Sequence, residues 1–251
     1  MSNPTAAILI IGNEILSGRT QDVNVNFIAK RLALLGIKLE EVRVVPDVPA
    51  RIIGAVNELR ASYSHLFTTG GIGPTHDDIT AECISAAFGV PWEVHPETFA
   101  LMEERMGKAN FNAARQRMAT FPRGATPIRN EVSLAPGFTI GNVHVMAGVP
   151  KIMQAMFLAL EPDLPRGTAI SMQSVYGLGL KEGSIAAGLS AIQDQFPQLD
   201  LGSYPFYAKE TGGGVALVAK GTDLAAIAAA IEAATQLIIS QGVTPVQGEP
   251  S

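Results

Sequence analysis

The sequence predicts an α/β protein: a three-layer, mostly parallel sheet followed by a small α+β second domain. Over about the first 160 residues, short apolar runs alternate with helical patterns, which is typical of a parallel sheet covered by helices on both faces. A stretch with two prolines and a glycine, 161–167, then ends this pattern and indicates a domain boundary. Beyond it, the expected order is strand, helix, strand, strand and helix.

The elements of the first domain follow from the spacing of apolar residues. A continuous aliphatic run, 7–11, is typical of a buried parallel strand. The spacing of Phe27, Ile28 and Leu32 predicts a helix over 23–35. By the same criteria, strands are expected at 39–45, 65–69, 126–128 and 143–146, and helices at 49–61, 78–88, 96–120 (interrupted near Gly107) and 151–160.

The first domain is expected to span 1–165, and a β-α-β-β-α domain is expected to follow over 168–242. The remaining residues, 243–251, are expected to form a frayed tail. An Ala-rich helix in the second domain is expected to lie in the core or in an interface. The predicted strands are 169–176, 200–205 and 215–220, and the predicted helices are 181–196 and 224–239.

The composition suits a folded protein and excludes several classes. The chain has 251 residues, of which 47% are hydrophobic and 16% charged, and its formal net charge is −5. Without a basic cluster, nucleic acid is not expected as a partner, because binding its phosphates needs one. The single cysteine, Cys83, rules out an internal disulfide and a cysteine-based zinc site. With no secretory signal and no apolar stretch of ~20 residues, we expect a cytoplasmic protein without a membrane partner.

The most informative segment is a Gly-rich loop between the strand at 65–69 and the next helix. It contains Gly70, Gly71 and Gly73, followed by Asp77 and Asp78. In an open α/β sheet, ligands bind outside the carboxyl ends of the strands, where glycines let backbone N–H groups approach a phosphate. Two carboxylates beside a phosphate would repel it unless a divalent cation lies between them. The loop therefore predicts a metal-assisted phosphate or pyrophosphate site.

The spacing of residues in these loops argues against two known nucleotide-binding motifs and leaves one structural interpretation open. A P-loop is rejected, because Gly12 and Gly18 are one residue too far apart and Arg19 stands where that motif has lysine. The Gly-rich loop also lacks the G-x-G-x-x-G order of a dinucleotide fingerprint. A capping box, in which Thr75 begins the helix and Asp78 returns the hydrogen bond, would account for Asp78 alone. Asp78 is therefore either a cation ligand or a helix cap.

Three further segments supply candidate residues. Glu14 follows the first strand, so the carboxyl end of that parallel strand should place it at the same edge of the sheet as the Gly-rich loop. Asn130, and Gly148 with Pro150, lie in turns that would supply backbone groups and small side chains to a pocket wall. Each turn, taken alone, is also consistent with a purely structural role.

Together, these segments resemble the CinA family of competence/damage-inducible proteins. The string Gly70-Gly71-Ile72-Gly73-Pro74-Thr75, followed by Asp77-Asp78 and Thr80, is similar to the signature of its molybdopterin-binding-like domain. The second domain resembles the KH-like domain that follows in this family, through Gly179-x-x-Glu182 and Ser203-Tyr204-Pro205. The other matching motifs, in order, are Gly12-x-Glu14-Ile15-Leu16-x-Gly18, Asp22-x-Asn24, Arg115, Pro122-x-Gly124-Ala125, Asn130, Ala135-Pro136-Gly137-Phe138 and Gly148-Val149-Pro150.

The resemblance implies a MoaB/Mog-like molybdopterin-binding fold. It implies a hydrolase of ADP-ribose-like or FAD-like pyrophosphates that releases AMP with a divalent metal such as Mg²⁺ or Co²⁺. Asp77, Asp78 and Glu14 would hold the metal and serve catalysis. A small-molecule nucleotide or pterin would be the partner, and a homo-oligomer, dimer or trimer, is expected. The substrate-binding residues would be Gly70, Gly71, Gly73, Pro74, Thr75, Asn24, Asn130, Gly148 and Pro150.

Two alternatives stay open. The same pocket would suit molybdopterin, as in an adenylyltransferase or a carrier, although the adenylyltransferase branch has a longer loop with Arg-Asp before its helix. The chain would instead be a non-catalytic nucleotide-binding protein if Ile152, which stands where the family often has Glu, marks a lost activity. The deamidase domain into which full-length family members continue is not expected here.

Overall fold

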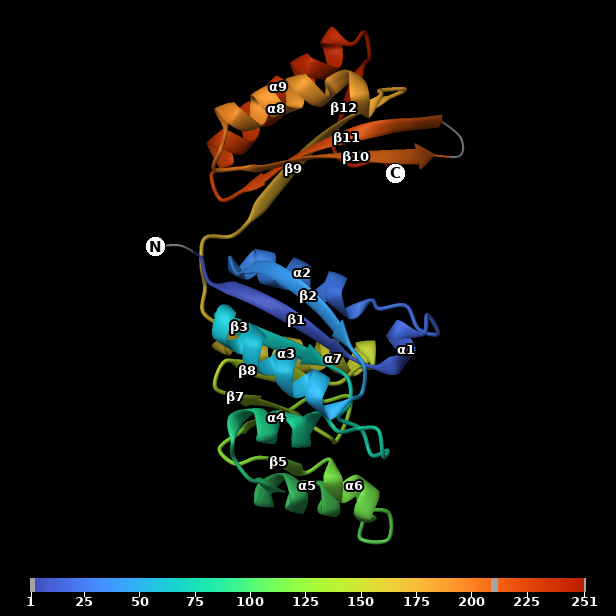
Figure 1. Cartoon of the computed structure of the whole chain (residues 1–251), viewed down its shortest axis with the longest axis vertical. Coiled ribbons are helices and arrows are strands. Elements are labelled where there is room, and N and C mark those ends of the chain that lie inside the picture. Colours follow the sequence, from blue (N-terminus) through green and yellow to red (C-terminus); the bar gives the residue numbers. More distant parts are fainter. Residues whose placement is uncertain (1–2, 209–211, 251) are drawn as a thin grey trace. The chain divides into compact units, whose positions relative to one another are not determined.

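The computed structural model describes residues 3–208 and 212–250. The chain divides into two compact units, Met1–Gly167 and Thr168–Ser251 (Figure 1). Each unit has its own hydrophobic clusters. Within the described residues, none of the helices combines the length and the apolar composition that crossing a bilayer requires.

The larger unit is built on a six-stranded sheet with the order β2-β1-β3-β8-β7-β6. Its strands are β1 (Thr5–Ile11), β2 (Lys38–Val45), β3 (His65–Thr69), β8 (Val143–Met146), β7 (Gly137–Ile140) and β6 (Thr126–Ile128). The first four are parallel, whereas β7 and β6 pair antiparallel at one edge. Ile10 pairs with Thr69, and Thr69 pairs with Met146, so the carboxyl ends of β1, β3 and β8 meet at one edge of the sheet.

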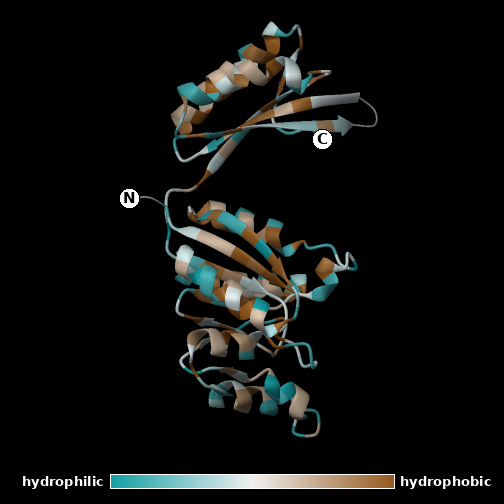
Figure 2. Cartoon of the chain, in the orientation of Figure 1, coloured by the Kyte–Doolittle hydropathy of each residue, from teal (hydrophilic) through white to brown (hydrophobic). Residues whose placement is uncertain are grey.

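Helices cover both faces of this sheet: α2 (Asn24–Leu35) and α7 (Pro150–Leu160) one face, α3 (Pro49–Ser62) and α4 (Thr80–Phe88) the other. This follows from the alternation of side chains along β1. Ile8 lies in one cluster with Leu32, and Leu9 lies in another with Ile52 and Ile84. Figure 2 shows hydrophobic residues along β1 and hydrophilic residues in many of the loops.

The predicted helix over 96–120 is in fact two helices, α5 (Pro96–Met106) and α6 (Ala113–Arg117). α5 ends where Gly107 takes φ +76°, a conformation that other residues rarely adopt. The end of the predicted range instead begins β5 (Thr120–Pro122), which pairs antiparallel with β4 (Trp92–Val94). Two short elements complete the unit, α1 (Asn13–Leu16) and the 3₁₀ turn η1 (Glu161–Asp163).

The smaller unit is an antiparallel sheet with helices on one face. It contains β9 (Ser171–Leu178), α8 (Glu182–Gln195), β10 (Asp200–Ala208), β11 (Gly212–Gly221), α9 (Leu224–Ser240) and β12 (Pro245–Gln247), with the strand order β10-β11-β9-β12. The Ala-rich helix α9 belongs to the core, where Ile227, Ala230 and Ala234 are buried against Val175 and Leu217 of the sheet.

The expected frayed tail over 243–251 is wrong in its first part. Residues Pro245–Gln247 form β12 and pair antiparallel with β9, through Val246 opposite Tyr176. The edge of β9 has unpaired backbone groups to offer, and Val243 packs against the core of the unit. A short segment thereby becomes ordered although its own apolar pattern is weak.

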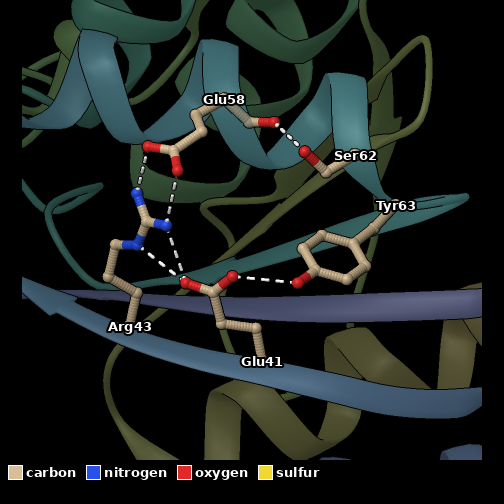
Figure 3. A network of polar contacts seen from close by, with 5 residues as sticks. All are labelled: Glu41, Arg43, Glu58, Ser62 and Tyr63. Atoms are coloured by element: carbon tan, nitrogen blue, oxygen red, sulfur yellow. Dashed lines mark hydrogen bonds and ion pairs between the residues drawn. The ribbon is translucent and has the colours of Figure 1, made fainter.

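A polar network fastens the edge strand β2 to α3 (Figure 3). The Arg43 guanidinium donates to both carboxylate oxygens of Glu58 at 2.7 and 3.1 Å and to Glu41 at 2.9 Å, and Tyr63 Oη donates to Glu41 at 2.9 Å. These bonds raise the pKa of Arg43 and lower that of Glu58. Charged side chains on an edge strand also oppose pairing with another chain.

Two histidines on the neighbouring strands β3 and β8 pack side by side. His65 Nδ1 lies 3.1 Å from His144 Nε2, and His144 Nδ1 lies 3.0 Å from Thr139 Oγ1. His144 is only 5% exposed, and burial, with a smaller contribution from His65, lowers its pKa to about 3. The His144 ring is therefore neutral in the folded protein over the physiological pH range.

This pair predicts a pH-dependent stability. The unfolded histidine titrates near ~6.5, so below that pH the unfolded state binds a proton that folded His144 refuses. Stability is complete above pH ~6.5 and falls as the pH falls toward about 3, by about 2 kcal/mol between pH 7 and 5. Urea unfolding at several pH values measures this slope. His144→Gln should flatten it, whereas the same substitution at exposed His76 should not. An unchanged slope in His144→Gln would contradict this origin.

Candidate functional site

The site lies where the parallel strands β1, β3 and β8 end. The loops that follow them carry Glu14, the Gly-rich segment from Gly70, and Gly148. The expectation that the Glu14 segment and the Gly-rich loop share one edge of the sheet is confirmed by the parallel pairing of β1 with β3. This edge is where α/β sheets bind ligands.

Gly70 fits between the ends of β1 and β8 because it has no side chain. Its N–H donates to Met146 O at 3.1 Å, which continues the pairing of β3 with β8. A Cβ on Gly70 would lie 2.1 Å from Ile11 O, and a Cβ on Gly148 would lie 3.3 Å from Gly70 Cα. The three strand ends therefore approach more closely here than side chains would allow.

Thr80, the first residue of α4, anchors the Gly-rich loop by two hydrogen bonds. Its hydroxyl donates to Gly70 O at 3.0 Å, and its N–H donates to Gly71 O at 3.0 Å. The side chain is fully buried. Gly71 has φ +66°, and a Cβ on it would lie 2.2 Å from Thr80 Oγ1, so this position requires glycine both for conformation and for space.

Asp78 closes a turn within the loop. Its carboxylate accepts hydrogen bonds from Thr75 N–H at 2.8 Å and from the Thr75 hydroxyl at 2.5 Å. The predicted capping box is wrong in one respect: α4 begins at Thr80 and follows Ile79, so the Thr75–Asp78 bonds shape the loop and not the helix end. A Cβ on Gly73 would lie 2.7 Å from Asp78 Oδ2, which ties this glycine to the same turn.

Asp77 points into a different environment. Its side chain is 60% exposed, and its Oδ1 lies 3.9 Å from Nδ1 of His76, whose side chain is 98% exposed. Thr75, with smaller contributions from a backbone hydrogen bond of Asp77 and from His76, lowers the pKa of Asp77 below its ordinary value. Asp77 is thus an ionised, accessible carboxylate at the tip of the loop.

The loop offers backbone donors. Over residues 3–208 and 212–250, no acceptor is found for the N–H groups of Gly71, Ile72 and Gly73. Unpaired N–H groups in succession form a concave surface that favours anions.

Arg117, at the end of α6, lies beside these donors. It lines a small pocket of about 20 Å³ with Gly71, Gly73 and Asp78. Its Cζ lies 5.2 Å from the centroid of the Trp92 ring, and its Nε is buried without a hydrogen-bond partner in the described part of the chain. Nothing in its spacing distinguishes Arg117 from the other basic residues of 96–120; the pairing of β4 with β5 brings it to the loop.

A second pocket, of about 60 Å³, lies on the other side of the loop. Glu14, Asn24, Gly70, Gly148 and Pro150 are among the residues that line it. Asn24 is 4% exposed, its Nδ2 donates to Gly148 O at 2.8 Å, and its Oδ1 is buried with no donor among the described residues. The structure therefore brings together four of the predicted substrate-binding residues, Asn24, Gly70, Gly148 and Pro150.

The three predicted metal ligands are not brought together. In the part of the chain that the structure describes, no group of three or more His, Cys, Asp or Glu side chains is arranged to hold a metal ion. Asp78 lines the pocket with Arg117, whereas Glu14 lines the pocket with Asn24. Asp77 and Asp78 follow β3 whereas Glu14 follows β1, and the loop stands between the two pockets.

Asn130 also lies elsewhere than expected. It lines a separate cavity of about 900 Å³, together with Arg105 and Arg129. Its Oδ1 accepts from Val132 N–H at 3.1 Å and Ser133 N–H at 2.6 Å, so its side chain is used to shape its own loop. A turn asparagine of this kind is a common structural element.

Comparisons with known proteins now identify the family. Residues 7–166 match the family described as "probable molybdopterin binding domain". The chain belongs to this family. Residues 171–247 match a second family, described as "FAD synthase, middle domain".

Relatives support the same assignment. A protein of Pyrobaculum calidifontis is 35% identical over 212 residues, which cover 80% of this chain and 81% of that one. A CinA-like protein of Desulforapulum autotrophicum is 34% identical over 206 residues, covering 76% of this chain and 49% of that one. The crystal structure of a CinA protein with unknown function from Thermoplasma acidophilum is 32% identical and has a TM-score of 0.61, covering 65% of this chain and 99% of that one. The predicted CinA resemblance and the predicted fold class are confirmed.

The packing around Gly71 can be tested against a matched glycine. Gly71 and Gly89 have φ of +66° and +65°, but a Cβ on Gly89 would meet nothing within 4 Å. Gly89→Ala should cost about 1–2 kcal/mol for the left-handed conformation alone. Gly71→Ala should cost about 1–3 kcal/mol more, because Thr80 must give up its bond to Gly70. Urea unfolding measures both, and equal losses would show that the contact with Thr80 is unimportant.

Proposed function

We propose that this protein is a metal-assisted hydrolase of nucleotide pyrophosphates, of the ADP-ribose or FAD type, that releases AMP. One observation carries the proposal: Gly71, Ile72 and Gly73, whose backbone N–H groups are unpaired among the described residues, line a pocket with Arg117, and the same loop carries an exposed, ionised Asp77. Donors that face an anion and a carboxylate that attracts a cation are the two parts that pyrophosphate cleavage requires.

The loop and Arg117 would bind the phosphates. Backbone N–H groups stabilise phosphate oxygens without a charge of their own. The guanidinium has a planar fork of donors that fits phosphate, and stacking on Trp92 fixes its orientation. Because Arg117 is half-buried and its Nε has no partner in the described part of the chain, its attraction to an anion is less screened than at a free surface.

The described residues fit a metal that arrives with the substrate better than a metal held in advance. Mg²⁺ is usually bound through one or two carboxylates together with substrate phosphates. Asp77 is the accessible carboxylate for this purpose, since an oxygen of Asp78 already accepts two bonds from Thr75. When bound, the cation would neutralise phosphate oxygens and lower the pKa of an attacking water. Glu14 lines the other pocket, so we assign it to the substrate and not to the metal.

The second unit favours a dinucleotide-like substrate. Residues 171–247 match the middle domain of FAD synthase. FAD itself contains a flavin and an adenine nucleotide. A pterin is the competing ligand, because the family of residues 7–166 is described as molybdopterin binding. Molybdopterin retained by the purified protein would favour a carrier role over hydrolysis.

The activity is tested with a panel of pyrophosphates. ADP-ribose, FAD, NADH and a nucleotide sugar are incubated with Mg²⁺, Co²⁺ or Ni²⁺, and AMP is measured by chromatography. We expect metal-dependent AMP release from at least one of them. If every substrate stays intact with every metal while ADP-ribose still binds, the protein is a non-catalytic nucleotide-binding protein and the proposal is wrong.

The role of Asp77 is tested by Asp77→Asn, which keeps the shape but removes the charge. Loss of the carboxylate should lower metal-dependent kcat about a hundredfold or more, because metal stabilisation is worth several kcal/mol. The same substitution at exposed Asp163, in η1, serves as the control and should leave kcat unchanged. Wild-type rates in Asp77→Asn would rule out the metal assignment.

Arg117 is tested by Arg117→Gln, with Arg115→Gln on the same helix as the control. Arg115 is exposed and donates to Asn110 O, away from the loop pocket. Calorimetric affinity for AMP should fall about tenfold to a hundredfold in Arg117→Gln, the value of a charged hydrogen bond, and change little in Arg115→Gln. Equal effects in the two variants would mean that Arg117 acts only through general charge.

A further inference from the structure

The pocket that contains Asn24 has an unused acceptor whose orientation is fixed. Asn24 Nδ2 must face Gly148 O, because that carbonyl can accept a hydrogen bond but cannot give one. The Oδ1 therefore points to the other side, where it is buried without a donor in the described part of the chain. A buried oxygen without a donor costs free energy, so a native structure retains one where a water or a ligand supplies the donor.

Glu14 adds a second acceptor to the same pocket. Its carboxylate is half-buried, lies close to Gly12, and makes no hydrogen bond or ion pair over residues 3–208 and 212–250. The other acid of the lining, Asp22, has one oxygen engaged within its own turn, because its Oδ1 accepts from Val25 N–H at 2.9 Å. No Lys, Arg or His is among the lining residues. The pocket is therefore suited to a group that donates hydrogen bonds and unsuited to a phosphate.

The size of the pocket limits what that group is. About 60 Å³ is far below the roughly 300–1,000 Å³ of clefts that hold a whole drug-sized ligand. A base or a flavin ring would not enter, whereas a pair of hydroxyl groups would. Two adjacent hydroxyls match two of the acceptors in this lining, the Glu14 carboxylate and Asn24 Oδ1.

The position of the pocket beside the Gly-rich loop indicates that the hydroxyl groups belong to a ribose. It shares Gly70 with the loop whose N–H groups we assign to phosphate. In a nucleotide, the ribose follows directly after the phosphate, so a phosphate on the loop carries its ribose to the adjacent pocket. An acid that accepts from ribose hydroxyls is also how dinucleotide-binding sheets recognise this sugar.

We infer that Glu14 and Asn24 form a subsite that binds the vicinal hydroxyls of a ribose attached to the bound phosphate. This inference rests on the proposed function, because the phosphate on the Gly-rich loop brings the ribose into reach. It makes the substrate a ribonucleotide pyrophosphate and excludes deoxyribose and non-ribosyl pyrophosphates as good ligands.

The test compares AMP with 2′,3′-dideoxy-AMP by calorimetry in the presence of Mg²⁺. Wild-type protein should bind the dideoxy compound about tenfold to a hundredfold more weakly, because the pocket's acceptors are then left without donors. Glu14→Gln should weaken AMP binding about tenfold and leave dideoxy-AMP binding unchanged. Asn24→Leu should also abolish the discrimination, but it removes the bond to Gly148, so Glu14→Gln is the decisive variant.

Glu40→Gln is the matched control. It is the same change from Glu to Gln, but Glu40 lies on β2, outside the pocket. It should leave both affinities unchanged. Equal binding of AMP and dideoxy-AMP by the wild type, or no AMP binding, would overturn the inference. So would equal weakening of both ligands in Glu14→Gln, which would mean that Glu14 acts through Mg²⁺ or through the loop.

The outcomes separate the inference from the proposed function. Hydroxyl discrimination without AMP release from any pyrophosphate would support the subsite and refute the hydrolase. AMP release without discrimination would support the hydrolase and refute the subsite.

Discussion

The contact between Gly70 and the end of β1 is the constraint on which the candidate site depends. A single Cβ at Gly70 would lie 2.1 Å from Ile11 O, and one at Gly148 would lie 3.3 Å from Gly70 Cα. The ends of β1, β3 and β8 can therefore converge only because the residues that meet there have no side chain. Any larger residue would push these ends apart, and the pockets on both sides of the loop would lose their shape.

Neutral groups build the scaffold around this contact. Thr80 holds Gly70 and Gly71 through a hydroxyl and an N–H, and Asn24 holds Gly148 through an amide. By contrast, Arg117 and Glu14 form no ion pair within the described residues. Charges that are not used to hold the fold together stay available to a ligand. The groups that stabilise this site are therefore different from the groups that would bind the ligand.

The sequence predicted most of this framework from local patterns. The strands 126–128 and 143–146, and the placement of Glu14 beside the Gly-rich loop, follow from apolar runs and from parallel topology. What it missed depends on contacts between distant segments: Arg117 reaches the loop through the pairing of β4 with β5, and β12 is ordered only by β9. A motif also says which residues are present but not where they point, so Asp78 and Glu14 looked like one metal site although they line different pockets.

The separation of those two acids is itself consistent with a nucleotide as ligand. On one side of the loop, backbone N–H groups and Arg117 offer donors; on the other side, Asn24 and Glu14 offer acceptors. A phosphate attached to a ribose has the complementary order, acceptors followed by donors. A cage of three carboxylates would have held a cation before the substrate arrived and repelled the phosphate when the cation was absent. An arrangement in which only Asp77 is left for the cation avoids that repulsion, because cation and phosphate then enter as one neutralised unit.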